Sequence, residues 1–222
     1  MRRGLIASAL LALVSCGGGG SSSTPTSPST PTTPTQTNRA PVINSMSITP
    51  TFGIAQLTTF NFSASASDPD GDTVSYAWNI AGNPFTTASG PITFASGGDG
   101  LASLTITDSK GASANDSRSF IVGTMAGTWN GVLGGLPITM TLAQPAGGII
   151  TGTWVQPIGS GVLDAATVNK IDAAGNVTMR LKVSQGRFND FTITGTMDQT
   201  GARIVAVANG SGFNGSPVVL TK

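Results

Sequence analysis

Apolar and polar residues alternate along most of this chain, and the alternation predicts short β-strands. In residues 39–123 the clearest run is Val74, Tyr76, Trp78 and Ile80, where every second side chain is apolar. A period of two indicates a strand with one buried face. About seven such strands fit the segment, which is typical of an immunoglobulin-like β-sandwich. We therefore expect a sandwich over residues 39–123 with Trp78 in its core.

The alternation restarts in residues 124–222, with longer strands separated by glycine-containing turns at 144–147, 172–175 and 198–201. The apolar faces of three predicted strands are Ile138, Met140 and Leu142, then Val177, Met179, Leu181 and Val183, and then Phe191, Ile193 and Met197. This spacing predicts an antiparallel meander, and about eight such strands can close into a small barrel. The predicted fold class is all-β: an immunoglobulin-like β-sandwich followed by a small antiparallel meander β-barrel, after a disordered tether.

The start of the chain follows a different pattern. Two arginines precede an apolar run, Leu5–Val14, that is too short to span a bilayer. A basic start, a short apolar core and a small residue before the cleavage point predict a secretory signal peptide over residues 1–15. Beyond Cys16, the chain up to residue 38 contains only Gly, Ser, Thr, Pro, Gln and Asn. Such a composition cannot form a core, so residues 16–38 are predicted to be a disordered linker.

The stretch Leu13-Val14-Ser15-Cys16 resembles the lipobox of bacterial lipoproteins. The resemblance implies cleavage before Cys16 and attachment of lipid to its thiol, so that the membrane becomes a partner through acyl chains such as palmitate. In that family an aspartate after the cysteine favours the inner membrane. Gly17 stands there instead, which implies the bacterial cell outer membrane, on either its periplasmic or its surface side. The alternative is an ordinary signal peptide that leaves a stray thiol.

Composition narrows the range of functions. The chain has no histidine and one cysteine, and all ten of its acidic residues are aspartates. A Ser-His-Asp triad, a Cys-His pair and a histidine zinc site are therefore excluded, and no motif marks an aspartate pair or a serine-lysine nucleophile. Without Arg2 and Arg3, nine basic residues face the ten aspartates, a net charge of −1. We therefore expect neither an enzyme nor a nucleic-acid-binding protein.

One cluster of acidic residues could bind a metal ion. Asp68, Asp70 and Asp72 alternate within the segment Asp68-Pro69-Asp70-Gly71-Asp72, and Asp108 could reach the same end of the sandwich. Carboxylate oxygens are the ligands that calcium prefers. The alternative is structural, because Asp, Pro and Gly in these places are the signature of a type I turn. No cofactor is required by the sequence, and calcium is the one that it suggests.

Residues 39–123 resemble the PKD-type and cadherin-like immunoglobulin folds of bacterial surface proteins. The resemblance rests on NRAPVI, on SASDPDGDTVSYAWNI and on LASLTITDSKGASA. It departs from the PKD pattern at Ile80-Ala81-Gly82-Asn83, where those repeats typically carry Gly-Asp. Some related domains bind calcium at aspartates placed like those of the acidic cluster, so the resemblance also implies a calcium site.

Residues 124–222 resemble small lipocalin-like or avidin-like barrels, through GTWNG at 127–131 and IITGTW at 149–154. The tryptophans of an avidin-type biotin site are missing after Trp154, so biotin binding is not implied. A barrel of this size is either filled by its own side chains or holds one small ligand. The apolar residues that would line a ligand pocket, or simply fill the core, are Met140, Trp154, Met179, Leu181, Phe191 and Ile193.

Three functional hypotheses follow. The first is a non-enzymatic envelope lipoprotein with a binding, adhesion or spacer role, whose partner is an envelope protein or a glycan. The second is a carrier of a small hydrophobic ligand inside the barrel. The third is a hydrolase that uses aspartates. It is the weakest hypothesis, because the aspartates fall mostly at turns and not in paired motifs.

Overall fold

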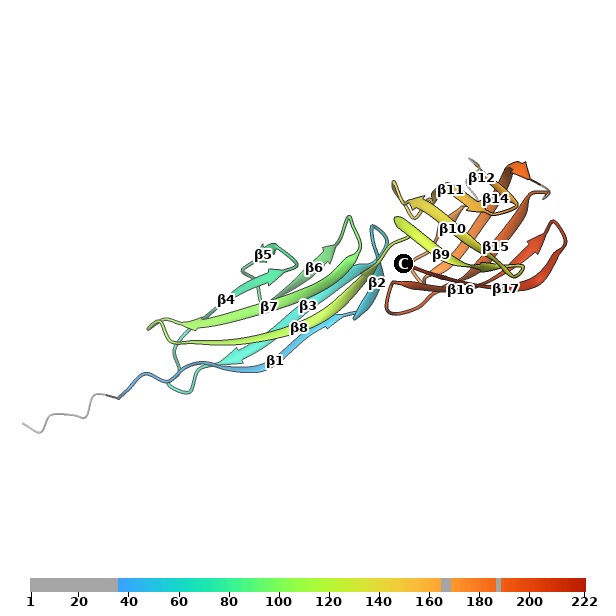
Figure 1. Ribbon diagram of the computed structural model, residues 1–222. Coiled ribbons are helices and arrows are strands. Elements are labelled where there is room, and N and C mark those ends of the chain that lie inside the picture. The colour runs from blue at the N-terminus through green and yellow to red at the C-terminus, as the bar shows by residue number, and fades with distance from the viewer. Residues whose placement is uncertain (1–35, 165–168, 187–188) are drawn as a thin grey trace, which may run out of the picture. The chain divides into compact units, whose positions relative to one another are not determined.

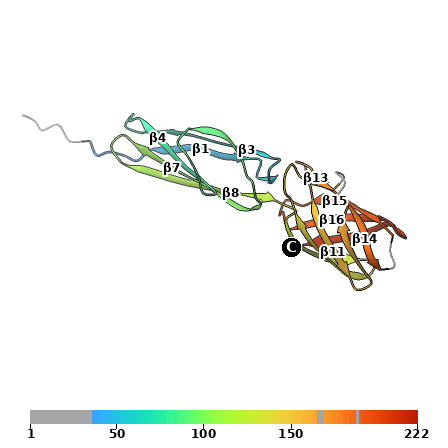
Figure 2. The ribbon, with the colours of Figure 1, turned by 90° about the horizontal axis from the view of Figure 1, so that it is seen from above.

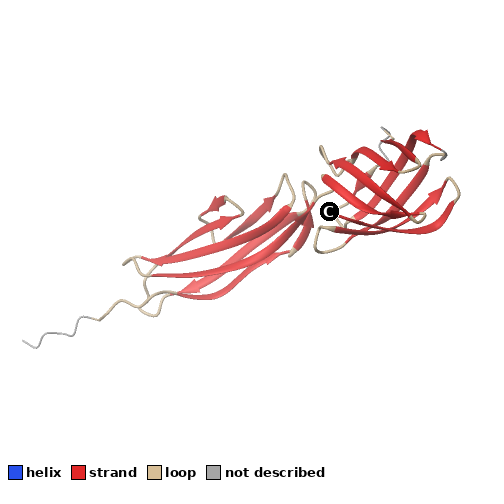
Figure 3. Ribbon diagram, viewed as in Figure 1, coloured by secondary structure: helices blue, strands red, loops and turns tan. Residues whose placement is uncertain are grey.

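The computed structural model describes residues 36–164, 169–186 and 189–222, and these residues form β-strands, turns and loops (Figure 3). In this described part, the chain has no helix that is long and apolar enough to cross a membrane. Residues 37–222 form one compact unit. The predicted signal peptide, the lipid site Cys16 and nearly all of the predicted linker lie outside the described residues.

Eight strands form the first module, in two sheets ordered β1-β3-β6 and β2-β8-β7-β4-β5 (Figure 1). Their bounds are β1 Val42–Thr49, β2 Phe52–Ile54, β3 Thr59–Ser67, β4 Val74–Ile80, β5 Asn83–Phe85, β6 Ser89–Thr93, β7 Gly98–Asp108 and β8 Ser113–Gly123. All pairings are antiparallel except that of β2 with β8, which is parallel. This module is the predicted immunoglobulin-like sandwich.

The core of the sandwich is aromatic, and Trp78 lies in it as predicted. Its side chain is buried, and its ring centroid lies 5.1 Å from that of Phe62. The indole N–H donates a hydrogen bond to the Thr87 carbonyl at 3.0 Å, so the polar edge of the ring is satisfied. Phe60 and Phe120 extend the cluster with a ring separation of 5.3 Å. Burial of these rings supplies the main stabilising contribution to a module without a disulfide.

Nine strands form the second module. Their bounds are β9 Gly127–Leu133, β10 Leu136–Ala143, β11 Thr151–Gln156, β12 Gly159–Leu163, β13 Lys170–Ile171, β14 Asn176–Gly186, β15 Phe191–Met197, β16 Arg203–Gly210 and β17 Phe213–Thr221. They follow the order β12-β11-β10-β9-β17-β16-β15-β14-β13, and pairing of β12 with β14 closes the sheet. Eight strands thus make a closed antiparallel barrel, with β13 as an added short strand; Figure 2 shows it from above. The predicted all-β fold is confirmed.

The inward faces of the barrel strands match the predicted alternation. Ile138, Met140 and Leu142 on β10 are all buried, and their polar neighbours point outward. Glycine is needed where neighbouring strands approach closely. At Gly152, whose φ is +148°, a β-carbon would lie 2.1 Å from the Thr141 carbonyl oxygen. Such residues let a small barrel curve tightly.

One segment of the sandwich joins the buried cluster of the barrel. Ile54, at the end of β2, is fully buried and belongs to the same apolar cluster as Trp129 and Met140. The buried side chain of Gln144 donates a hydrogen bond to the Ala55 carbonyl at 3.0 Å. These contacts place the two modules within one compact unit.

Candidate functional site

The acidic cluster at the β3–β4 turn is the first candidate site. Asp68, Asp70 and Asp72 each offer a carboxylate oxygen, and these atoms lie within 4.8 Å of one another. The turn is present as well, since the N–H of Gly71 donates to the Asp68 carbonyl at 3.1 Å. Asp68 Oδ1 accepts the backbone N–H groups of Asp70 at 2.8 Å and Asp72 at 3.3 Å. The turn therefore gathers the three carboxylates without help from a ligand.

One carboxylate oxygen of this cluster, Asp68 Oδ2, is buried and has no hydrogen-bond partner among the described residues. Asp108 does not belong to this group of three carboxylates; it accepts a hydrogen bond from Asn38 Nδ2 at 2.8 Å. The donor set is thus all oxygen, as calcium prefers.

Two cations neutralise part of the cluster. Arg39 contacts Asp70 at 2.7 Å, and Lys110 contacts Asp72 at 2.9 Å. The hydrogen bond to Asp72 raises the pKa of Lys110 above its usual value. These two side chains would compete with a metal ion for the carboxylates.

Asp108 has a separate role in its own turn. Burial raises the pKa of this carboxyl, but hydrogen bonds from Asn38 and from the backbone N–H groups of Lys110 and Ala112 outweigh that effect and leave the pKa below its usual value. Asp108 is therefore an anchor of the β7–β8 turn.

The barrel interior is the second candidate site. The six predicted pocket residues lie in one buried cluster, with exposures of 2% or less; they are Met140, Trp154, Met179, Leu181, Phe191 and Ile193. The rings of Trp154 and Phe191 meet edge to face at 5.4 Å. All six side chains are buried among one another, as both a packed core and an enclosed pocket require.

A groove on the outside of the barrel is the third candidate. Three adjoining depressions share Gln185 and run over β10, β11, β12 and β14 to the end of the barrel. We call this surface the neutral groove; its main side chains are Thr139, Thr141, Thr153, Val155, Ile158, Ser160, Val162, Ser184, Gln185, Asn189 and Asp190. Asp190 is the one charged residue of its described lining. Hydroxyl, amide and small apolar groups make up the rest.

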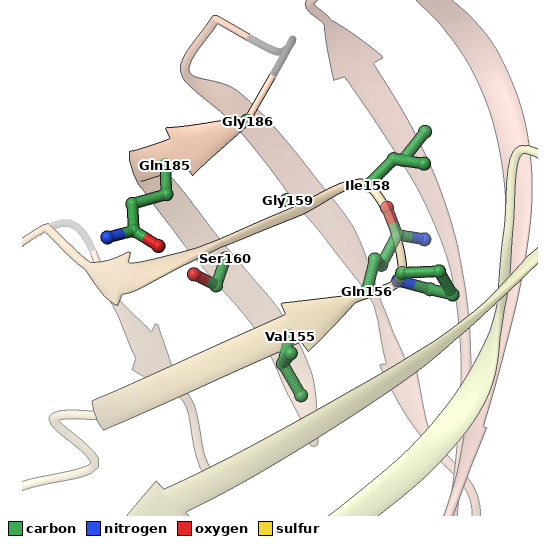
Figure 4. A pocket seen from close by; sticks show the side chains of 8 residues that line it. Val155, Gln156, Ile158, Gly159, Ser160, Gln185 and Gly186 are labelled. Carbon is green, nitrogen blue, oxygen red and sulfur yellow. The ribbon is translucent and has the colours of Figure 1, made fainter.

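Figure 4 shows the end of the neutral groove. Val155, Ser160 and Gln185 come from the adjacent strands β11, β12 and β14. Gly159 and Gly186 pair across β12 and β14, so no side chain covers the backbone there. The groove is open at this point because its floor is backbone.

Sequence reasoning did not identify the neutral groove. Its residues are the polar positions of ordinary strands, and their gathering depends on which strands meet when the barrel closes. The pairing of β12 with β14 brings Ser160 beside Gln185, which is 25 positions later in the chain. The one signal of this groove in the sequence was the lack of charged residues in β10 and β11.

A comparison with family models identifies the first module. Residues 38–122 match the model of the PKD domain. The first module is therefore similar to PKD domains. The predicted resemblance is thereby confirmed for these residues, whereas the lipoprotein and lipocalin-like predictions remain predictions. A search of curated proteins found no match.

Solved structures similar to the chain include two PKD domains. The PKD1 domain of Vibrio anguillarum Epp is 26% identical, with 39% of this chain and 96% of that chain covered and a TM-score of 0.33. The PKD1 domain of the Vibrio cholerae metalloprotease PrtV is 24% identical, with 38% and 98% covered and a TM-score of 0.32. A third structure, from work on carbohydrate-binding modules of the β-sandwich superfamily, is 14% identical, with 83% of this chain and 91% of that chain covered and a TM-score of 0.38.

Proposed function

We propose that this chain is a lipid-anchored, non-enzymatic binding protein of the bacterial outer membrane. Lipid on Cys16 holds the chain at the envelope, the linker separates the folded part from the bilayer, and the PKD-type sandwich supports the barrel. The barrel then binds an envelope component through its outer surface. Two or three acyl chains make such an anchor effectively permanent.

The observation that carries the binding role is the packing of the barrel. Its interior is occupied by buried side chains such as Met140 and Phe191, so its outer face is the surface available to a partner. The neutral groove is a concave part of that face. The absence of histidine and glutamate from the sequence supports a role in binding rather than catalysis.

Cosedimentation with isolated cell envelopes tests the binding role. Residues 37–222 form a compact unit and can be used without the lipid anchor. We expect the wild-type piece to sediment with envelopes. The variant Val155→Asp, which places a charge in the neutral groove, should sediment less. Val205→Asp on β16, outside the groove, is the matched control and should behave as the wild type. A piece that stays in the supernatant would contradict the proposal.

The carrier role is the alternative, and it requires the six buried residues to move apart around a ligand. Native mass spectrometry of residues 37–222, purified without detergent, separates the two roles. We expect the mass of the polypeptide alone. A retained hydrophobic compound would favour the carrier.

We also propose that the acidic cluster binds calcium. The specific support is the placement of three carboxylate oxygens within 4.8 Å of one another, together with the buried Asp68 Oδ2, which has no hydrogen-bond partner among the described residues. Calcium would take oxygen ligands from Asp68, Asp70 and Asp72 and would tie the β3–β4 turn to the start of the sandwich. Arg39 competes for the same site because it is paired with Asp70.

Titration calorimetry with calcium tests this second proposal. The wild-type piece should bind, Asp68→Asn should lose binding, and Arg39→Ala should bind more tightly because Asp70 is released. Asp116→Asn removes a carboxylate that pairs with Arg118 elsewhere in the sandwich and should change nothing. Absence of binding heat in both the wild type and Arg39→Ala would refute the site.

A further inference from the structure

The neutral groove contains an irregularity that gathers polar side chains. Ser160 pairs with Gln185, but the next residue, Gly161, pairs with Val183, so Ser184 is an extra residue on β14. In a regular strand, Ser184 and Gln185 would point to opposite faces of the sheet. The bulge instead lets both of them line the groove. Bulges of this kind re-aim side chains and recur beside functional sites.

A buried acceptor lies at the end of the same groove. Gln156 is 5% exposed and lines the depression, and its Nε2 donates to the Leu133 carbonyl at 3.1 Å. Its Oε1 is buried and has no hydrogen-bond partner among the described residues. Gln156 is buried on the opposite face of β11 from the exposed Val155, so its Oε1 belongs to the inside of the barrel end and not to the ligand-facing surface of the groove.

The few charges of the neutral groove restrict the class of ligand that it can bind. Asp190 is the one charged residue among the described residues of the lining, and its Oδ1 already accepts the backbone N–H of Val183 at 3.0 Å. Lys182 lies opposite Val162 on the neighbouring strand. The described residues therefore do not present the repeated positive charges that an acidic polymer would need, and a neutral ligand fits them better.

The side chains also argue against a protein partner. Hot spots of protein interfaces are enriched in Trp, Tyr and Arg that insert into pockets. The described lining has no tyrosine or arginine, and Trp154, its one tryptophan, is buried. Serine, threonine, glutamine and asparagine side chains can instead donate to and accept from hydroxyl groups, and Val155 and Ile158 can cover C–H surface.

We infer that the neutral groove binds an extended, uncharged, hydroxyl-rich polymer, that is, a neutral glycan chain. The groove continues from Thr141 on β10 to the end of the barrel at Ile158, so it accommodates a chain rather than a single sugar. Ser184 and Gln185 hydrogen-bond the glycan, and Val155 and Ile158 cover its C–H surface. This inference rests on the proposed binding function and names its ligand class.

Affinity gel electrophoresis of residues 37–222 tests the inference. Gels contain dextran, laminarin or galactomannan as neutral probes, or alginate as an acidic probe. We expect retardation by at least one neutral probe and none by alginate. The double variant Ser184→Ala with Gln185→Ala should lose roughly tenfold or more in affinity, because two hydrogen bonds are removed. Thr178→Ala with Thr194→Ala, a paired set on β14 and β15 outside the groove, should retain wild-type affinity.

The outcomes separate this inference from the proposed function. Retardation by none of the neutral probes, or retardation that the Ser184 and Gln185 variant leaves unchanged, overturns the glycan inference. If the wild type still sediments with envelopes in that case, the proposed binding function stands and its ligand is of another class. Circular dichroism of each variant shows whether it is folded, and Val155→Asp provides a second test of the groove.

Discussion

At the residue scale, single glycines decide whether the barrel can close. A β-carbon on Gly161 would lie 1.9 Å from the Lys182 carbonyl oxygen and 2.7 Å from Trp154 Nε1. Neither the backbone nor a fully packed indole can move away at low cost. The sequence showed that glycines recur in the barrel strands, but it could not show which of them face a neighbouring backbone.

Gly161→Ala should therefore lower the free energy of unfolding by about 1–3 kcal/mol, as overpacking does elsewhere. Urea unfolding of residues 37–222 measures this effect. Gly215→Asn is the control, because Gly215 has φ of +65° and no atom within 4 Å of a built β-carbon, and asparagine tolerates that conformation. Equal stabilities for both variants would contradict the close approach of β12 and β14.

The carboxylate of Asp172 makes the stability of the fold depend on pH. A hydrogen bond from the Asn176 side chain, with further bonds from backbone N–H groups, holds the pKa of Asp172 below its usual value. The folded state thus favours the ionised carboxylate. This contribution is complete above the unfolded pKa of about 3.9 and is lost as the pH falls through the lower folded value.

Asn176→Ala removes the largest of these interactions. The variant should be less stable than the wild type near neutral pH, and the difference should shrink as the pH falls below the unfolded pKa and through the lower folded pKa of Asp172. Urea unfolding at neutral pH and at the lowest pH at which the wild type stays folded provides the two values. A difference that is the same at both values would mean that Asn176 acts through packing and not through the carboxylate.

At the element scale, the strands with strict alternation were predictable from the sequence and the short ones were not. β4 and β10 bury alternate apolar side chains, and such a pattern predicts a strand with one buried face. β2, β5 and β13 contain two or three residues each, too few for a period to show. The parallel pairing of β2 with β8 and the bulge at Ser184 depend on tertiary contacts, and so the neutral groove could not be predicted.

The filled barrel leads to a prediction for its strands. Met140 on β10 is fully buried beside Trp129 and Trp154, its cross-strand partners. Met140→Ala should open a cavity and cost about 2–5 kcal/mol in thermal or urea unfolding. Val219→Ala, at an exposed position on β17, should change stability by less than about 0.5 kcal/mol. An unchanged stability for Met140→Ala would indicate a flexible interior that a ligand could enter.

At the scale of the whole molecule, the low charge and the absence of histidine agree with a binding role. The described surface of the barrel is made largely of hydroxyl, amide and small apolar groups, and the acidic cluster lies on the sandwich. In the proposed function, lipid on Cys16 holds these two modules at the envelope. Their cores hold without a disulfide, because the chain has a single cysteine.

Metabolic labelling with tritiated palmitate tests the anchor most directly. Bacteria expressing the full chain should yield a labelled polypeptide in the outer-membrane fraction. Cys16→Ala should be unlabelled and should leave that fraction, whereas Ser22→Ala in the linker should behave as the wild type. A wild-type chain that carries no label, or a Cys16→Ala variant that keeps it, would contradict the account.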